Sequence, residues 1–440
     1  MSGTTERYAR HVDPSFIRLL GVLGYGRVFT RAEDVYVWDE HGRRYLDLLA
    51  GFGSVNIGHN HPRLVARMCD FLKAQPLNLA HTSPSPQAAL LAEALARAAG
   101  YPLEISLFSN GGAEAVEAAM KLARAATGRT RLVACEGAYH GLSLGTLSLT
   151  GSTRMRAPFE PLLPGCHTVP FGDAGALERE LEGGHAAAFV VEPVQIEGGV
   201  RFPPSGYLQD ARRLCTKHRT LLVLDEVQTG FGRLGSAFAF HEEGVVPDIV
   251  VLAKSAGGSV APIGITMTTR AIQKKAYGSM RRFDLHGSTF AGNAFACAAA
   301  LETLQILDEE RLCANSRERG DELLAGLRQR LRGHPLVRDI RGRGLLVAIE
   351  LRAAVEKLAE VLVGQWLSVA LLERGAIVQP ASQAWHVLRL EPPLTLQREH
   401  VTEAIEVIGG VFDAHRALAP LLTRAAWRMG AQLASRGAFR

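Results

Sequence analysis

The sequence has few cysteines, no long apolar run and no block of charge of one sign. Its six cysteines are scattered, with no CxxC pair and no histidines at metal-ligand spacing, so we predict reduced thiols and no metal site. No apolar run approaches the roughly 20 residues of a membrane span. The polar N-terminal residues lack the apolar core of a signal peptide. These absences predict a cytoplasmic protein that does not associate with membranes.

The charge balance is modest and evenly spread. Lysine and arginine number 49 and acidic residues 44, which gives a formal net charge of +5. No basic run carries interleaved aromatic residues, so nucleic acid binding is not predicted. Hydrophobic residues make up 47% and charged residues 21%, as in ordinary globular proteins. A chain of 440 residues is too long for one small core and indicates two or three lobes.

One stretch, residues 221–254, combines two short apolar runs that each end on a charged residue. The first run ends on Asp225 and the second on Lys254. Such runs are typical of buried strands in a parallel sheet. Ligands of open α/β sheets bind at the carboxyl ends of the strands, so both side chains are predicted to face one crevice. On position alone, a salt bridge between two strand ends is an equally good interpretation.

The order of the elements predicts the fold class. Strand and helix patterns alternate from about residue 105 to 265, which favours a doubly wound, mostly parallel α/β sheet with right-handed crossovers. A hairpin is expected at 35–48, a loop at 50–58, and a smaller α+β lobe after about residue 318, with one of its strands at 377–380. We predict three parts: an N-terminal arm with part of the small domain (1–70), a large domain (71–317) and a C-terminal small domain (318–440). The basic tail, 420–440, is expected to be helical and has no assigned role.

A turn of small residues follows the expected strand at 105–108. It includes Gly111, Gly112 and Ala113 and leads into a long amphipathic helix. Free N–H groups and the positive end of the helix dipole make such a turn suitable for an anion, and glycine allows a phosphate to come close. The turn matches neither a Walker loop nor the GxGxxG fingerprint that a nicotinamide dehydrogenase would need.

Further polar or aromatic residues follow the other strands. Tyr139 comes just after the strand at 131–134, where its ring is placed either to stack on a flat ligand or to pack against a loop. Glu192 and Glu197 follow the strand at 186–191. His59 and His61 lie close together without a neighbouring carboxylate or cysteine, so we expect turn or capping duty rather than metal binding.

One ligand would use all of these groups: a planar cationic ring that carries a phosphate and an aldehyde. A lysine would form a Schiff base with the aldehyde, and an aspartate would pair with the protonated ring nitrogen. The combination therefore predicts pyridoxal 5′-phosphate (PLP) as the cofactor.

The same residues carry a family resemblance. The segment 224–233, LDEVQTGFGR, followed by Pro247-Asp248 and Lys254, resembles the signature of class III (subgroup II) aminotransferases. The resemblance continues through Gly58–Pro62, Tyr139–Gly141 and the segment 389–394, and it covers nearly the whole chain. It implies a fold-type I PLP enzyme, with a large seven-stranded-type sheet domain and a smaller α+β domain made from both chain ends.

The resemblance implies specific roles around the cofactor. Lys254 would be the Schiff-base lysine and the proton shuttle, and Asp225 would pair with the pyridine nitrogen. Gln228 would lie near the phenolic oxygen, and Tyr139 would stack on the ring.

The resemblance also implies how the phosphate is held. Gly112 and Ala113 would bind it through backbone N–H groups, and Thr289 would reach it from the neighbouring subunit, which implies an obligate homodimer with shared active sites. The family's usual turn, Ser-Asn-Ser-Gly-Thr, reads Ser-Asn-Gly-Gly-Ala at 109–113. A hydroxyl is therefore missing, and weaker cofactor affinity is expected.

On the substrate side, Glu192 and Glu197 would line the pocket and Arg389 would bind the α-carboxylate of the acceptor, a task that suits a bidentate guanidinium. In the family, the glutamate at position 197 pairs with this arginine and swings away when a dicarboxylate arrives. Ile196 replaces a smaller residue and is expected to narrow the pocket.

The implied activity is ping-pong transamination between an amine and an oxo acid such as 2-oxoglutarate. The segment 389–396, RLEPPLTL, resembles putrescine and other diamine aminotransferases more than acetylornithine ones, which favours a terminal (ω) amine donor: a diamine, an ornithine-like compound or a secondary-metabolite amine. The alternatives are an N-acylornithine aminotransferase, an aminomutase or decarboxylating enzyme of the same fold, and an inactive regulatory protein that keeps the fold.

Overall fold

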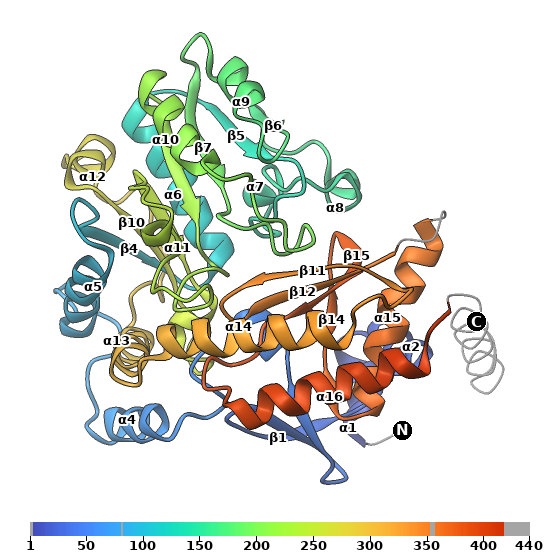
Figure 1. Ribbon diagram of the computed structural model, residues 1–440. Helices are drawn as coiled ribbons and strands as arrows, with labels where there is room; N and C mark the ends of the chain where they lie inside the picture. The colour runs from blue at the N-terminus through green and yellow to red at the C-terminus, as the bar shows by residue number, and fades with distance from the viewer. Residues whose placement is uncertain (1–2, 81, 353–356, 418–440) are drawn as a thin grey trace.

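The computed structural model describes residues 3–80, 82–352 and 357–417 (Figure 1). Its central sheet has seven strands in the order β4-β10-β9-β8-β7-β5-β6. These strands are β4 (Ile105–Ser109), β5 (Arg131–Cys135), β6 (Cys166–Val169), β7 (Ala186–Val191), β8 (Leu221–Asp225), β9 (Ile249–Leu252) and β10 (Gly264–Thr268). Strand β10 runs antiparallel to both of its neighbours, and the other pairs are parallel. The predicted α/β fold with a mostly parallel, seven-stranded sheet is confirmed.

Helices cover both faces of this sheet, because its strands are apolar on both sides. Val190 and Val223 belong to the apolar cluster formed with α6 (Gly112–Thr127) and α12 (Arg270–Tyr277). Their neighbours Phe189 and Leu224 point to the opposite face. That face is covered by α5 (Pro86–Ala99), α9 (Ala174–Leu181), α10 (Tyr207–Lys217) and α13 (Ala294–Glu309). Shorter turns of helix are α7 (Leu144–Leu147), α8 (Thr153–Arg156), α11 (Ala239–Glu242), η1 (Ala157–Phe159) and η2 (Lys254–Gly257).

Two four-stranded sheets accompany the central one. The first has the order β1-β2-β3-β13 and the second β11-β12-β15-β14. Their strands are β1 (Phe29–Glu33), β2 (Tyr36–Asp39), β3 (Arg44–Asp47), β11 (Val337–Arg343), β12 (Leu346–Leu351), β13 (Ala376–Ile377), β14 (Gln379–Ala381) and β15 (Ala384–Leu390). Parallel pairing of β13 with β3 joins the two ends of the chain. The single strand predicted at 377–380 is wrong, because the chain changes sheets at Val378.

The remaining helices pack around these small sheets. They are α1 (Gly3–His11), α2 (Pro14–Leu23), α3 (Ala50–Gly53), α4 (Pro62–Lys73), α14 (Leu312–Arg330), α15 (Lys357–Glu373) and α16 (Arg398–Ala414). Helices α14 and α16 lie side by side in Figure 1, in orange and red. The loop expected at 50–58 begins with the short α3. Both predicted domain boundaries, after residues 70 and 317, fall inside helices, and the division into domains stays a prediction.

Within the described ranges, no helix is both long and apolar enough to span a bilayer. The tail predicted to be helical, 420–440, lies outside the described residues.

Candidate active site

A cavity of about 270 Å³ opens at the carboxyl ends of the parallel strands. This volume is close to the lower end of ordinary small-molecule pockets. Seven of the residues singled out in the sequence line it: Gly112, Ala113, Tyr139, Glu192, Asp225, Gln228 and Lys254. The fold thus brings together side chains from the ends of β7, β8 and β9 and from the start of α6, as expected of an open α/β sheet.

Lys254 enters the cavity from an unusual backbone conformation. It follows β9 directly and has a φ of 50°, in the left-handed region that residues other than glycine rarely adopt. Such outliers cluster at functional sites. Burial lowers the pKa of Lys254 below the ordinary 10.5, although the charges of Glu391, Glu197 and Asp225 oppose the shift. A lowered pKa makes the neutral, nucleophilic amine more available near neutral pH.

Asp225 lies at the end of β8 and is held on both sides. Its Oδ1 accepts a hydrogen bond of 3.0 Å from the N–H of Val227, and its Oδ2 lies 2.7 Å from His140 Nδ1. His140 is buried, and its Nε2 has no hydrogen-bond partner among the described residues. These contacts fix the orientation of a carboxylate that retains lone pairs for a further donor. His140 belongs to the segment Tyr139–Gly141 that carries the family resemblance, but no role was predicted for it.

The positive end of α6 forms another wall of the cavity. Gly112 and Ala113 are the first residues of this 16-residue helix, where N–H groups have no partner within the helix. Asn110 is anchored beside them, because its N–H and its side-chain amide both donate to Glu114 Oε2, over 2.8 and 2.9 Å. The same amide donates to Ser288 Oγ over 2.9 Å. This turn can therefore present backbone donors to an anion.

A buried ion pair lies next to Tyr139. Arg389, 1% exposed, donates through Nη1 to Glu197 Oε1, and Ser382 N donates to Glu197 Oε2 over 3.1 Å. Burial works against ionisation of Glu197, but the charges of Arg389 and Lys254 outweigh it and lower its pKa to about 2. By contrast, burial and the charge of Asp225 raise the pKa of Glu192 well above the usual value. Two glutamates on one loop thus favour opposite charge states.

Two further residues, Glu391 and Phe52, lie next to this ion pair. Glu391 is fully buried, accepts a hydrogen bond of 2.7 Å from Gln228 Nε2, and has its Oε1 3.5 Å from Arg389 Nη1. Phe52 covers the other side, with its ring centroid 4.8 Å from the guanidinium carbon of Arg389. No role was predicted for Glu391, although it lies in the segment 389–394 that carries the family resemblance, two residues after Arg389.

Other predicted residues lie elsewhere. Thr289 is exposed and does not line the cavity, so its contact across subunits stays a prediction. The expectation that Ile196 narrows the pocket is wrong, because its side chain is buried in an apolar cluster with Val387 and Leu346. Of the two histidines expected to have turn or capping duty, His61 stands at the N-cap position of α4, although its side chain makes no capping hydrogen bond. His59 Nε2 lies 2.8 Å from Asp47 Oδ2, and His61 Nε2 lies 3.1 Å from Glu310 Oε1.

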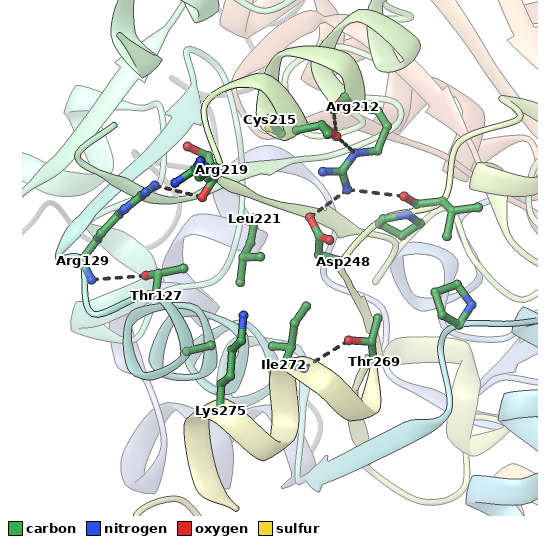
Figure 2. Close-up of a pocket in the computed structure, with 16 residues that line it drawn as sticks. Thr127, Arg129, Arg212, Cys215, Arg219, Leu221, Asp248, Thr269, Ile272 and Lys275 are labelled. Atoms are coloured by element: carbon green, nitrogen blue, oxygen red, sulfur yellow. Dashed lines mark hydrogen bonds and ion pairs between the residues drawn. The ribbon is translucent and has the colours of Figure 1, made fainter. Parts of the chain in front are cut away.

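A larger cavity, of about 640 Å³, opens at the amino-terminal edge of the same sheet (Figure 2). It begins at Leu221, the other end of β8, about 13 Å from Asp225 along the strand. Two of its three arginines are engaged: Arg129 donates to three backbone oxygens, and Arg212 pairs with Asp248 over 2.7 Å. The reactive groups therefore belong to the smaller cavity.

Comparison with known proteins places this arrangement in a family. The family model for class III aminotransferases matches residues 23–412. The chain belongs to the class III aminotransferase family. The ornithine aminotransferase of Toxoplasma gondii ME49 has a similar structure, with a TM-score of 0.81 and 33% identity over 88% of this chain and 90% of that one.

Two other solved structures are similar. An amine transaminase from an uncultivated Pseudomonas species, in its PLP-bound form, has a TM-score of 0.82 and 32% identity over 89% of this chain and 95% of that one. An (S)-enantioselective ω-transaminase from Thermomicrobium roseum has a TM-score of 0.85 and 33% identity over 93% and 98% of the two chains. The enzyme is a PLP-dependent aminotransferase, EC 2.6.1.

The cavity's groups fit this cofactor. It offers helix N–H groups suited to a phosphate, a fixed carboxylate suited to a protonated ring nitrogen, and a partly buried amine suited to an aldehyde. Tyr139, half-buried at its mouth, offers a ring face for stacking.

The lowered pKa of Lys254 predicts how PLP capture depends on pH. Because the neutral amine forms at lower pH than in an ordinary lysine, the rate at which cofactor-free protein captures PLP is expected to rise with pH around a midpoint below 10.5. Stopped-flow absorbance would measure this rate, and a free lysine derivative at each pH would correct for titration of the cofactor. A midpoint at or above that of the free derivative would contradict the assignment.

Proposed function

We propose that the enzyme transfers the amino group of a terminal (ω) amine, such as a diamine or an ornithine-like compound, to 2-oxoglutarate. The supporting observation is the buried contact between Arg389 and Glu197 beside Tyr139. This pair allows one binding site to accept both the amine donor and the dicarboxylate acceptor. While Glu197 holds Arg389, the subsite presents no free cation and admits an amine without an α-carboxylate. Once Glu197 moves away, Arg389 can bind a dicarboxylate bidentately.

Each residue has a part in this proposal. PLP, when bound, supplies the aldehyde that takes up the amino group and the ring that stores negative charge. Asp225, fixed by Val227 and His140, keeps the ring nitrogen protonated. Lys254 Nζ takes a proton from the substrate carbon that bears the amine and delivers it to the cofactor side. The first N–H groups of α6 orient the phosphate.

The same residues would serve both half-reactions: Lys254 would move the proton in one direction when the amine is the substrate and in the opposite direction when 2-oxoglutarate accepts the amino group. Glutamate and an aldehyde or its cyclised form are the products of one cycle. The names of the similar proteins, an ornithine aminotransferase and an ω-transaminase, support this substrate class.

We also propose that the enzyme works as a homodimer. Around Thr289, four large apolar side chains are exposed: Met280 by 87%, Phe283 by 66%, Leu285 by 54% and Phe290 by 55%. Apolar side chains gathered in this way are typical of a surface that a partner covers. A second copy of the chain would bury them and bring its Thr289 toward the phosphate turn.

A donor screen tests the proposed function. Purified enzyme is incubated with PLP, 2-oxoglutarate and a panel of diamines, ornithine, N-acetylornithine and α-amino acids, and glutamate is measured. Terminal amines without an acyl group are expected to give glutamate at rates at least about tenfold above α-amino acids. Preference for N-acetylornithine would instead support the acylornithine enzyme. If no amine yields glutamate, the proposed transamination is wrong for this chain.

A further inference from the structure

The cavity at the amino-terminal edge of the central sheet has no part in the proposed mechanism (Figure 2). Its volume of about 640 Å³ is more than twice the 270 Å³ of the active-site cavity and lies in the ordinary range for small-molecule pockets. Its walls come from the ends of α6 and α10, the start of β8, the residues before β9, and α12. Segments far apart in the sequence thus meet around one hollow.

The charged side chains that line this cavity are mostly cations. Four cations face one carboxylate, so the lining carries a net charge of +3: Arg129, Arg212, Arg219, Lys275 and Asp248. Arg212 and Asp248 cancel each other at 2.7 Å, and Asp248 is also held by the N–H of Leu222, over 2.7 Å. Glu104, two positions beyond the lining at residue 102, is neutralised by Arg270 over 2.8 Å. The positive charge of the cavity is therefore left uncompensated.

Two of these cations have no partner. The side chains of Arg219 and Lys275 make no hydrogen bond or ion pair with any residue that the structure describes. In Figure 2, Lys275 rises from α12 with its Nζ toward the open centre, and Arg219 lies across the cavity. Arg129 donates to carbonyl oxygens at the end of α10 and keeps its charge beside them. Like charges around one hollow repel one another, and a bound anion would relieve that repulsion.

The cavity also offers apolar surface. Its lining includes five apolar residues from several walls: Pro102, Leu221, Val246, Pro247 and Ile272. A small inorganic anion would use the cations and leave this surface, and most of the volume, without contact. Because the two partnerless cations stand on different walls, a ligand that reaches both needs more than one anionic group. An organic compound that carries two phosphates meets both conditions.

We propose that this cavity binds a diphosphate ester of the nucleoside diphosphate class. The phosphates lie between Arg219 and Lys275, and the organic part packs against Leu221 and Ile272. The site is separate from the cofactor's phosphate turn, because it stands at the other end of β8 from Asp225. The proposal goes beyond the transamination and does not depend on it.

Calorimetry on the PLP-loaded enzyme in magnesium-free buffer tests the site, since PLP then fills the other phosphate site. ADP is expected to bind once per chain with a Kd of about 0.1 mM or lower, and PLP absorbance is expected to stay unchanged. Pyrophosphate is expected to bind about tenfold more weakly, and adenosine not at all. Lys275→Gln and Arg219→Gln are each expected to weaken ADP binding about tenfold.

The matched controls are Lys274→Gln and Arg213→Gln, which remove exposed cations beside the cavity that do not line it. Both are expected to leave the Kd unchanged. An equal loss in the controls would mean general attraction to a basic surface, and would overturn the proposal. So would the absence of ADP binding, release of PLP by ADP, or pyrophosphate binding as tight as that of ADP. These three comparisons use the wild type and no turnover, so they judge the site even if a variant misfolds or the donor screen yields no glutamate.

Discussion

Replacing Lys254 with alanine is expected to lower kcat/KM for any amine donor by about 10⁴-fold. The change removes both the amine that holds the cofactor covalently and the base that moves the proton. Among the described residues, Lys254 is the only lysine that lines the cavity, and the histidine that lines it, His140, is engaged with Asp225 over 2.7 Å. Steady-state glutamate production would measure the loss. Intact-mass analysis after borohydride treatment would show PLP attached to the wild-type chain and not to the variant.

Lys217→Ala is the matched control for this prediction. Lys217 pairs with Glu178 at the surface, so its removal is expected to leave the rate and the borohydride result unchanged. Turnover by Lys254→Ala within tenfold of the wild type would show that another group is the base. Far-ultraviolet circular dichroism of the two variants would separate that outcome from a folding defect.

The sequence predicted those parts of the site that depend on local pattern. A short apolar run that ends on a charged residue can be recognised from a few consecutive residues. Parallel strands place the carboxyl ends of all such runs at one edge of the sheet. Asp225 and Lys254 therefore came together as predicted, as did Tyr139 and the turn at Gly112. The same alternation of strand and helix predicted the mostly parallel sheet, and the family resemblance implied its seven strands.

The parts that were missed or wrong depend on contacts between residues far apart in the chain. His140 and Asp225 are separated by 85 positions, and Gln228 and Glu391 by 163, so no local pattern reveals that they touch. Ile196 was expected to narrow the pocket because it replaces a smaller residue in the family's pattern. Its side chain points instead to the small sheet, where Val387 and Leu346 bury it. Which way a loop residue points is decided by the partner that covers it.

The contact between His140 and Asp225 gives the second prediction with a large effect. Asp225→Asn is expected to lower kcat by about 10³-fold, because a neutral amide cannot stabilise the protonated ring nitrogen as a fixed carboxylate does. The KM for the amine is expected to change little, since Asp225 lies on the ring side of the cavity, away from the pair of Arg389 and Glu197. Initial rates over a range of amine concentrations would separate the two constants.

Substitution of His140 tests whether its contact with Asp225 contributes to catalysis. If the imidazole acts by orienting Asp225 over the 2.7 Å contact, His140→Asn alone is expected to lower kcat about tenfold. In the Asp225→Asn background the same change is expected to have almost no effect, since the charge it oriented is gone. Equal losses in both backgrounds would mean that His140 acts independently of Asp225. A coupled result would place the imidazole, the carboxylate and the ring nitrogen in one chain of hydrogen bonds, with the buried His140 as its fixed end.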